Sequence, residues 1–489
     1  MIKKILFIFG LLSTFKAESQ KFFQKATGSF SSGFIGSTTS NSPFLLRSNQ
    51  YGLVPFKSNL AYFNVNIKKE YDSLFSLKRK LRPFGYGYGI EVQANVGNVN
   101  QVLLPVAYAK VRYKSFEFYA GRRKEIQGLV DTLGTIGSYI WSGNALPLPK
   151  VEISIPNYTP IFGNGLLSMK GNFAHGWFGK GDSVQNVLLH QKSLYLKIGK
   201  PSWKISMIGG FNHQVQWGGY PTKPFYDNIS KQVISKFGND FPTFLNIVSG
   251  VSLSKSGKGW DNQTGVAGNE AGNRSGNHLG TLDIGMELRL TGGRLLVYRQ
   301  SIFDDGSLFY LNNISDGLFG VSFVSSKLQN SLKNITLEYL NTTNQGGRNF
   351  FNQAPELRGL DNYFDNSIYR DGWTYKNQTI GNSLIVPLSN LDLKNNYIKN
   401  PNNLISNRVS AINLNMFYSY KGFIANSQIV STRNFGNYDY TIDKSQIHIK
   451  QNITYFYKGI HYHTTIASDL GELWARALGL NLGVKKVFR

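Results

Sequence analysis

The sequence predicts an all-β protein, a transmembrane antiparallel β-barrel, and three observations lead to this prediction. Many segments alternate apolar and polar residues with a period of two, as strands do. The start of the chain reads as an export signal. No later apolar run reaches about 18 residues, so no spanning helix is expected. A barrel is the structure that lets an exported chain cross a membrane without such a helix, because its strands satisfy one another's backbone groups.

The first nineteen residues read as a secretory signal peptide. Lys3 and Lys4 supply the positive charge, Ile5–Leu12 is a short apolar run, and Ala17 and Ser19 are the small residues before a cleavage site. The alternative is an anchoring helix, which the shortness of the apolar run disfavours. Export and the absence of cysteine together mean that no disulfide is available to stabilise the chain.

Residues 20–50 carry no clear period, and we expect a periplasmic lead-in there, with short helices. The barrel is expected over residues 51–489. Gly85–Val96 is the clearest strand, with Tyr, Ile, Val and Ala on one face and Gly, Glu, Gln and Asn on the other. That pattern suits lipid outside and water inside. Similar runs occur at 105–114, 116–121, 194–198, 203–211, 282–290, 412–418, 447–455, 460–466 and 477–485.

A soluble β-sandwich is the alternative explanation of this alternation. Its strands would also be apolar on one face only. The number of strands exceeds that of a typical sandwich, and Tyr, Trp and Phe cluster near strand ends, as in the aromatic girdles of membrane barrels. These two features favour the barrel.

One stretch, Tyr139–Tyr158, interrupts the strands. Four prolines lie in it or just beyond, and each removes a backbone donor, so we expect neither a ladder strand nor a helix. The stretch is nevertheless rich in large apolar side chains, which must pack against something. We therefore expect it to fold against the barrel as a plug or wall, represented by Trp141, Asn144, Pro147 and Pro149.

Long loops are expected near residues 221–278 and 346–407. The first could hold a short helix around Ile229–Phe237, and Lys255–His278 is rich in Gly, Asn and Ser, as flexible loops are. Barrels of this kind join their strands by short periplasmic turns and long surface loops, and binding usually resides on the long ones.

The chain is strongly basic, with 53 Lys and Arg against 28 Asp and Glu and a net charge of +25. Nucleic acid is the common partner of such a charge, but export excludes it. An acidic polysaccharide or the phosphates of lipopolysaccharide fit the compartment better. The alternative is a solvated charge lining the lumen without a specific ligand.

No catalytic group or cofactor site can be recognised. Asp304 and Asp305 precede a glycine and read as a turn rather than as an acid pair. His461 and His463 share one face of a strand, but no third metal ligand can be placed. The seven histidines accompany no nucleophile signature, so we expect no enzyme, no cofactor and no metal.

Aromatic residues beside polar groups are better candidates for a binding site. Trp and Tyr rings stack on sugar rings, while Arg and Asp bind hydroxyls and carboxylates. The alternative for each is an aromatic that only packs, at an interface or against the plug. The candidate polysaccharide-binding residues are Arg370, Asp371, Trp373, Tyr375, Trp217 and Tyr220.

Five segments, in order, resemble the capsule assembly Wzi family in its Bacteroidetes-type branch: W-S-G-N-A-L-P-L-P at 141–149, Q-W-G-G at 216–219, Y-R-Q-S-I-F-D-D at 298–305, D-G-L-F-G at 316–320 and Y-R-D-G-W-T-Y…I-G-N at 369–382. The similarity runs from about Tyr51 to Phe488. It implies an outer-membrane barrel of roughly 18 strands with periplasmic helices, within the usual size range. It also implies a lectin-like role in attaching capsular polysaccharide to the cell surface.

The expected function is therefore non-enzymatic: an outer-membrane protein that attaches or helps to assemble capsular polysaccharide or exopolysaccharide. The expected partners are an acidic polysaccharide, outer-membrane lipid and lipopolysaccharide, with the capsule export machinery as a further one. The alternative is a porin or solute channel whose basic lumen prefers anions.

Overall fold

A computed structural model describes residues 25–72, 82–227, 231–251, 274–304, 307–327, 330–349, 359–391 and 405–488. The expected signal peptide, Asp305 and most of the loop at 255–278 lie outside these residues.

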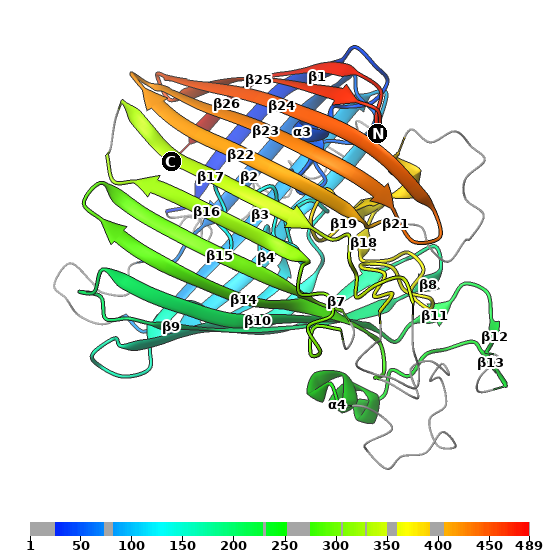
Figure 1. The fold of residues 1–489 in the computed structure, drawn as a ribbon. Coiled ribbons are helices and arrows are strands. Elements are labelled where there is room, and N and C mark those ends of the chain that lie inside the picture. Colours follow the sequence, from blue (N-terminus) through cyan, green and yellow to red (C-terminus); the bar gives the residue numbers. More distant parts are fainter. Residues whose placement is uncertain are drawn as a thin grey trace, which may run out of the picture.

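The fold is a closed antiparallel barrel of 18 strands (Figure 1). Each strand pairs with the next barrel strand along the chain. The last strand pairs with the first and closes the barrel, with Gly28 opposite Phe488 at one end of the ladder and Ser37 opposite Gly479 at the other. The expected strand number is confirmed. The strands are β1 (Thr27–Ser37), β2 (Leu60–Lys69), β3 (Phe84–Gly97), β4 (Gln101–Tyr113), β5 (Phe116–Arg122), β6 (Lys150–Pro160), β7 (Leu167–Gly179), β9 (Val187–Ile198), β10 (Ile205–Trp217), β14 (Asn277–Leu290), β15 (Gly293–Phe303), β16 (Gly317–Ser325), β17 (Ser331–Asn341), β22 (Val409–Tyr420), β23 (Phe423–Gly436), β24 (Thr441–Tyr457), β25 (Ile460–Gly471) and β26 (Ala477–Phe488).

The direction of the alternation distinguishes a membrane barrel from a sandwich. On β3 the apolar side chains are exposed, Ile90 by 46% and Val96 by 52%, whereas Glu91 and Gln93 are only 6% and 5% exposed. A soluble sheet would bury the apolar face instead. A membrane barrel requires polar side chains inside and apolar side chains facing the lipid, and this pattern recurs around the wall.

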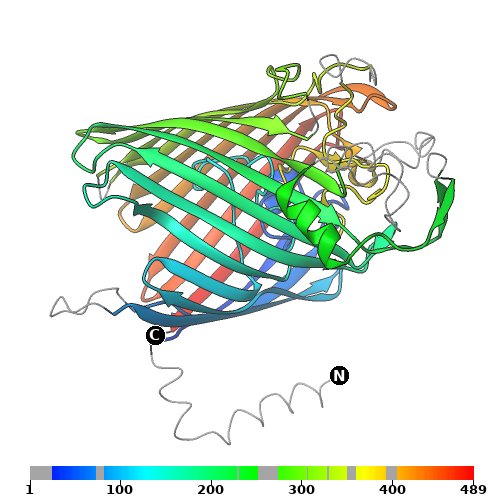
Figure 2. The same ribbon diagram turned by 90° about the horizontal axis from the view of Figure 1, so that it is seen from below.

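The two ends of the barrel differ in the length of their connections. At the short-turn end, pairs such as Lys421–Gly422 and Lys458–Gly459 join neighbouring strands, with φ values of 40° and 85° and of 46° and 73°. Positive φ at both positions matches the twist of a two-residue hairpin. β1 begins and β26 ends at this end, which is on the left in Figure 2. The other end, the long-loop end, carries the connections at 217–277 and 341–409.

Two expectations about which segments form barrel strands are wrong. Residues 27–37 are not a lead-in, because they form β1 and close the barrel. Lys150–Pro160 is not outside the ladder, because it forms β6. Its prolines are tolerated because β6 pairs with β5 only as far as Ser154 and its register with β7 shifts between Ile155 and Thr159.

The long loops carry small elements: α3 (Phe44–Arg47), β8 (Val184–Gln185), β11 (Tyr220–Pro221), β12 (Phe225–Asp227), β13 (Gln232–Ile234), α4 (Phe241–Ser249), β18 (Thr374–Tyr375), β19 (Gln378–Thr379), β20 (Val386–Pro387), the 3-10 turn η4 (Leu388–Asn390) and β21 (Ile405–Ser406). Within the described residues no helix has the length and apolarity needed to span a membrane.

The helix expected at Ile229–Phe237 lies further along the chain, as α4. Asp240 caps its start by accepting from the Thr243 N–H at 2.8 Å, and Gly250 ends it with a φ of 65°. Gln232–Ile234 is a strand instead. α4 lies against the outside of the barrel wall, where its Phe244 contacts outward-facing rings of β7, β9 and β10 (Figures 1 and 2).

Candidate functional site

The connection between β5 and β6 folds into the lumen instead of leaving the barrel. We call residues 123–149 the inner segment. Trp141–Leu148 are buried throughout, and this stretch includes the predicted residues Trp141, Asn144 and Pro147. Pro149 is half-buried, and its carbonyl accepts from the Trp177 N–H at 3.1 Å. The segment thus lies where the sequence placed it, while its role as a plug stays a prediction.

Inward-facing polar side chains of the wall hold the inner segment. Asp131 accepts from Asn334 at 2.5 Å and Thr336 at 3.0 Å, and also from Ser322. Glu338 accepts from the Ile136 N–H at 2.7 Å. These carboxylates satisfy donors that burial would otherwise leave unpaired, which is what fixes a loop inside a barrel.

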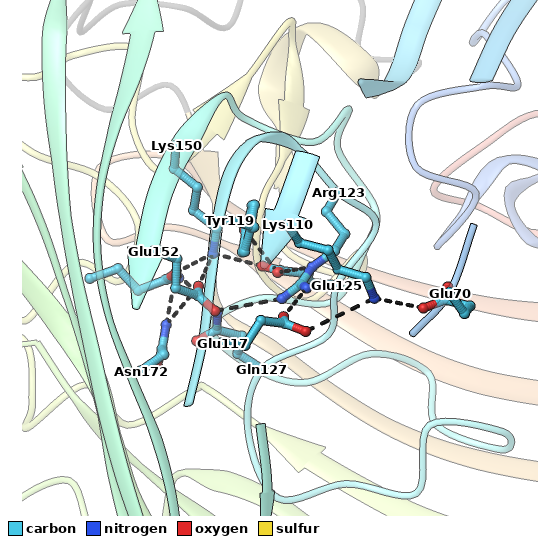
Figure 3. A network of polar contacts seen from close by, with 11 residues as sticks. Glu70, Lys110, Glu117, Tyr119, Arg123, Glu125, Gln127, Lys150, Glu152 and Asn172 are labelled. Carbon is cyan, nitrogen blue, oxygen red and sulfur yellow. Dashed lines mark hydrogen bonds and ion pairs between the residues drawn. The ribbon is translucent and has the colours of Figure 1, made fainter. Parts of the chain in front are cut away.

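A network of ion pairs anchors the two ends of the inner segment, and Figure 3 shows it. Lys150 Nζ lies 2.6 Å from Glu125 and 2.9 Å from Glu152. Arg123 lies 2.8 Å from Glu125, pairs with Glu117 as well, and stacks over the Tyr119 ring at 3.9 Å. Because every partner is largely removed from water, the loss of one would leave the others as buried charges without a counter-charge.

Glu125 is the carboxylate on which this network converges. Burial alone would raise the pKa of Glu125, but Lys150 and Arg123 outweigh burial and lower the pKa to about 2. Glu125 therefore stays ionised at neutral pH and holds both cations. The cavity beside it measures about 740 Å³, and we call it the paired-charge cavity; it is lined by residues including Lys110, Glu117, Arg123, Glu125, Glu152, Lys170 and Asn172.

A second cavity lies at the long-loop end, between the β7–β9 connection and the β17–β22 connection. We call it the loop cavity; it has a volume of about 610 Å³. Asp371 joins its two sides by accepting from the Asp182 and Ser183 N–H groups at 2.9 and 3.0 Å. The remaining lining includes the aromatic, basic and amide side chains of Phe178, Tyr369, Tyr375, Lys180, Lys376 and Asn377, together with apolar residues and a second carboxylate, Asp182.

Two of the predicted binding aromatics cannot offer a face to a sugar in this structure. Trp373 is fully buried, donates its indole N–H to the Ile140 carbonyl at 2.8 Å, and packs between Trp141 and Phe178. Trp217 is buried beneath α4. Neither ring is open to a sugar in this structure, and the reason is the same for both: the sequence pattern does not reveal that another segment covers a loop aromatic.

The other four predicted residues are placed differently. Asp371 and Tyr375 line the loop cavity, and Tyr375 accepts from Arg122 at 3.0 Å. Arg370 is exposed but is not part of the lining. Tyr220 is 42% exposed and is not part of the loop-cavity lining, and Lys236 Nζ lies 5.7 Å from its ring. Whether any of the four binds polysaccharide stays a prediction.

Sequence reasoning missed the lysines of the loop cavity. Lys376 and Asn377 form the tight turn between β18 and β19, with φ values of 53° and 60°. The K-N pair between two short strands was the signal that could have revealed this turn. Lys180 follows β7 directly, and only the fold brings it to the same cavity.

The candidate metal residues do not assemble a site. His463 shares a hydrogen bond of 2.7 Å with the Tyr62 hydroxyl, and His461 packs on Phe456. Asp304 directly follows β15 at the long-loop end. Among the described residues no group of three or more His, Cys, Asp or Glu side chains could hold a metal ion.

Several solved structures are similar to this chain over most of their length. Acinetobacter baumannii OccAB4 has a TM-score of 0.45 at 9% identity, covering 95% of this chain and 97% of that one. Pseudomonas aeruginosa OpdQ has a TM-score of 0.45 at 9% identity, covering 95% and 98%. The outer membrane channel DcaP of A. baumannii has a TM-score of 0.37 at 9% identity, covering 95% and 96%. No curated protein matches the chain.

The family comparison is more specific. The model of capsule assembly protein Wzi matches residues 24–386, which is well over half of the chain and begins upstream of the resemblance seen in the sequence. The closed barrel with its apolar outer face lies in the outer membrane. The chain belongs to the capsule assembly protein Wzi family, which acts in capsule assembly at the outer membrane.

Proposed function

We propose that this protein holds an acidic capsular polysaccharide at the cell surface, without catalysing a reaction, and that the loop cavity is the binding site. The observation that carries the proposal is the composition of that cavity. Lys180 and Lys376 can pair with sugar carboxylates, while Tyr375 and Asn377 supply a ring edge and an amide for hydroxyls. The cavity also holds two carboxylates: backbone N–H groups already occupy that of Asp371, and the two lysines outnumber that of Asp182.

The placement of the cavity supports the same proposal. Membrane barrels carry short turns on the periplasmic side and long loops outside, so we infer that the long-loop end faces the medium. The buried Trp373 makes the cavity wall rigid, because its packing between Trp141 and Phe178 ties the loop to the inner segment. A preorganised site loses little entropy when a flexible polymer binds.

The test compares two double variants of the full chain, purified in detergent, for binding to the organism's own surface polysaccharide. In the first, Lys180→Gln and Lys376→Asn remove both cations of the loop cavity, and asparagine suits the positive φ of position 376. In the control, Lys57→Gln and Lys444→Gln remove two exposed cations from the same end of the barrel that do not line the cavity.

We expect the first variant to bind about tenfold or more weakly, which corresponds to about 1.4 kcal/mol. The control should bind as the wild type does, and added salt should weaken wild-type binding. Equal losses in both variants would mean that charge alone, and not this cavity, attracts the polymer. A deletion strain that kept normal surface polysaccharide would refute the role itself.

A further inference from the structure

A third cavity, on the opposite side of the lumen from the paired-charge cavity, has no role in the proposed function. It measures about 590 Å³, and we call it the amide cavity. The segment at 45–54 and part of the inner segment cover it toward the long-loop end. Its wall consists of inward side chains of β1–β3 and β22–β26, among them Asn415, Phe417, Gln428, Lys450, Asn481 and Lys485.

The amides of this wall are only partly used by the protein. Gln428 donates to Asn413 at 2.9 Å, and Asn452 donates to Thr465 at 2.6 Å. Asn481 accepts a long hydrogen bond of 3.4 Å from Tyr62. Each amide has two donors and an acceptor with two lone pairs. Asn64, Gln93 and Asn426 use both donors within the protein. Among the described residues, Asn415, Gln428 and Asn481 each make a single side-chain hydrogen bond and keep capacity for water or a ligand. Neighbouring donors and acceptors of this kind match the vicinal hydroxyls of a sugar.

Lys450 and Lys485 are the two cations of the wall, and Lys450 is the more buried of the two. Its Nζ has no ion pair with any carboxylate in the part of the chain that the structure describes. Glu91 is the carboxylate that lines the same cavity, but it already accepts from Lys124 at 2.8 Å, Asn64 at 2.8 Å and Asn66 at 3.1 Å. A partly buried ammonium without a counter-charge favours an anion from outside.

Phe417 adds an apolar surface among these polar groups. It points inward on β22, at the position where the register with β17 is irregular. None of the aromatic contacts found among the described residues involves it, so no other ring covers its face. An aromatic face beside amides and a cation can bind the C–H face of a sugar ring.

We propose that the amide cavity is a second saccharide site, which takes a sugar unit carrying a carboxylate or a phosphate. Lys450 binds the anionic group, Asn415, Gln428 and Asn481 bind the hydroxyls, and Phe417 packs on the ring. The ligand class rests on the proposed function, but the site is distinct from the loop cavity. No described residue of the turns at the short-turn end lines the cavity. The cavity is therefore open toward that end, and the sugar enters there.

The probes are three small sugars, added to the full chain in detergent and measured by saturation-transfer NMR. Glucuronic acid tests the carboxylate, glucose 6-phosphate tests the phosphate, and glucose is the neutral comparison. We expect millimolar binding of at least one acidic sugar and at least fivefold weaker binding of glucose. Equal binding of all three, or no binding of any, would overturn the proposal.

Two variants and one matched control locate the site. Lys450→Gln should weaken binding of the acidic sugar at least tenfold, and Phe417→Leu should weaken all the sugars by a smaller factor. Lys170→Gln should have no effect, since Lys170 is a lumen lysine on the opposite wall, with its Nζ about 5 Å from the rings of Tyr158 and Tyr195. Loss of binding in Lys170→Gln, or full binding in Lys450→Gln, would contradict the assignment.

The two proposals fail in different ways. If the wild type captures polysaccharide but binds no small acidic sugar, the amide cavity is not a site and the loop cavity is unaffected. If the Lys180 and Lys376 variant keeps polysaccharide binding while Lys450→Gln loses the acidic sugar, the amide cavity is confirmed as a site and the loop cavity is rejected as the polysaccharide site.

Discussion

The two inner walls of this barrel are built from different polar chemistry. Along β4–β6, cations and carboxylates alternate and pair with each other, and Lys150, Arg123 and Glu125 bind the ends of the inner segment. Along β22–β26 the wall is mostly amide, and Lys450 has no carboxylate at ion-pair distance among the described residues. The difference teaches that paired lumen charge holds polypeptide in place, and it leaves Lys450 available for the sugar that we propose.

The strongest test of this comparison is Lys150→Met, which removes the cation from the paired wall. Glu125 and Glu152 would lose their partner in a buried site, so we expect the free energy of unfolding to fall by about 3–5 kcal/mol. Urea unfolding in detergent, followed by tryptophan fluorescence, measures the change. The double variant Lys150→Met with Glu125→Gln should lose less than Lys150→Met alone, and a larger loss would show that packing and not charge dominates.

Asp131→Asn should loosen the middle of the inner segment. The carboxylate serves donors on β16 and β17, and an amide cannot accept from all of them, so we expect a loss of about 1–3 kcal/mol. Single-channel recording in planar bilayers should show a nearly closed wild type and larger conductance in the variant. Asp443→Asn is the control, because its pair with Arg433 is exposed and should not matter. A wild type that conducts steadily would instead favour the porin alternative.

Acid should weaken the paired wall through Glu125. Its pKa is lowered to about 2 from 4.5, so the folded state holds the ionised form more tightly than the unfolded state. The stabilisation is present above about pH 4.5 and is lost as pH falls toward 2. The thermal midpoint of the wild type should therefore fall over this window. Glu125→Gln should fall less steeply, and parallel curves for the two proteins would contradict the assignment to Glu125.

The smallest effect is expected from Lys450→Gln on the amide wall. Removing a cation without a carboxylate partner breaks no ion pair, so the unfolding free energy should stay within about 0.5 kcal/mol of the wild type or rise slightly. The same urea measurement compares it directly with Lys150→Met. A loss as large as that of Lys150→Met would show that Lys450 is also structural, and the contrast between the walls would disappear.

The sequence anticipated much of the barrel because alternation is a local property. In β3 or β26 each residue's face follows from its neighbours two positions away, and lipid and water then select the faces. β1 and β6 were missed for local reasons too: small polar residues hide the period of the first, and prolines hide that of the second. Asp240 and Gly250, which cap α4, are residue types that mark the two ends of a helix in a sequence.

The candidate sites depended on contacts that no local pattern encodes. Asp131 meets Ser322 and Asn334 about 200 residues away, and Trp373 is buried by Trp141 from another loop. The sequence by itself determined the barrel, its apolar outer face and its polar inner face. Only the tertiary structure decided which inward charges are paired, which aromatics are covered and where cavities remain, because those outcomes depend on strand register and on how two long connections fold against the wall.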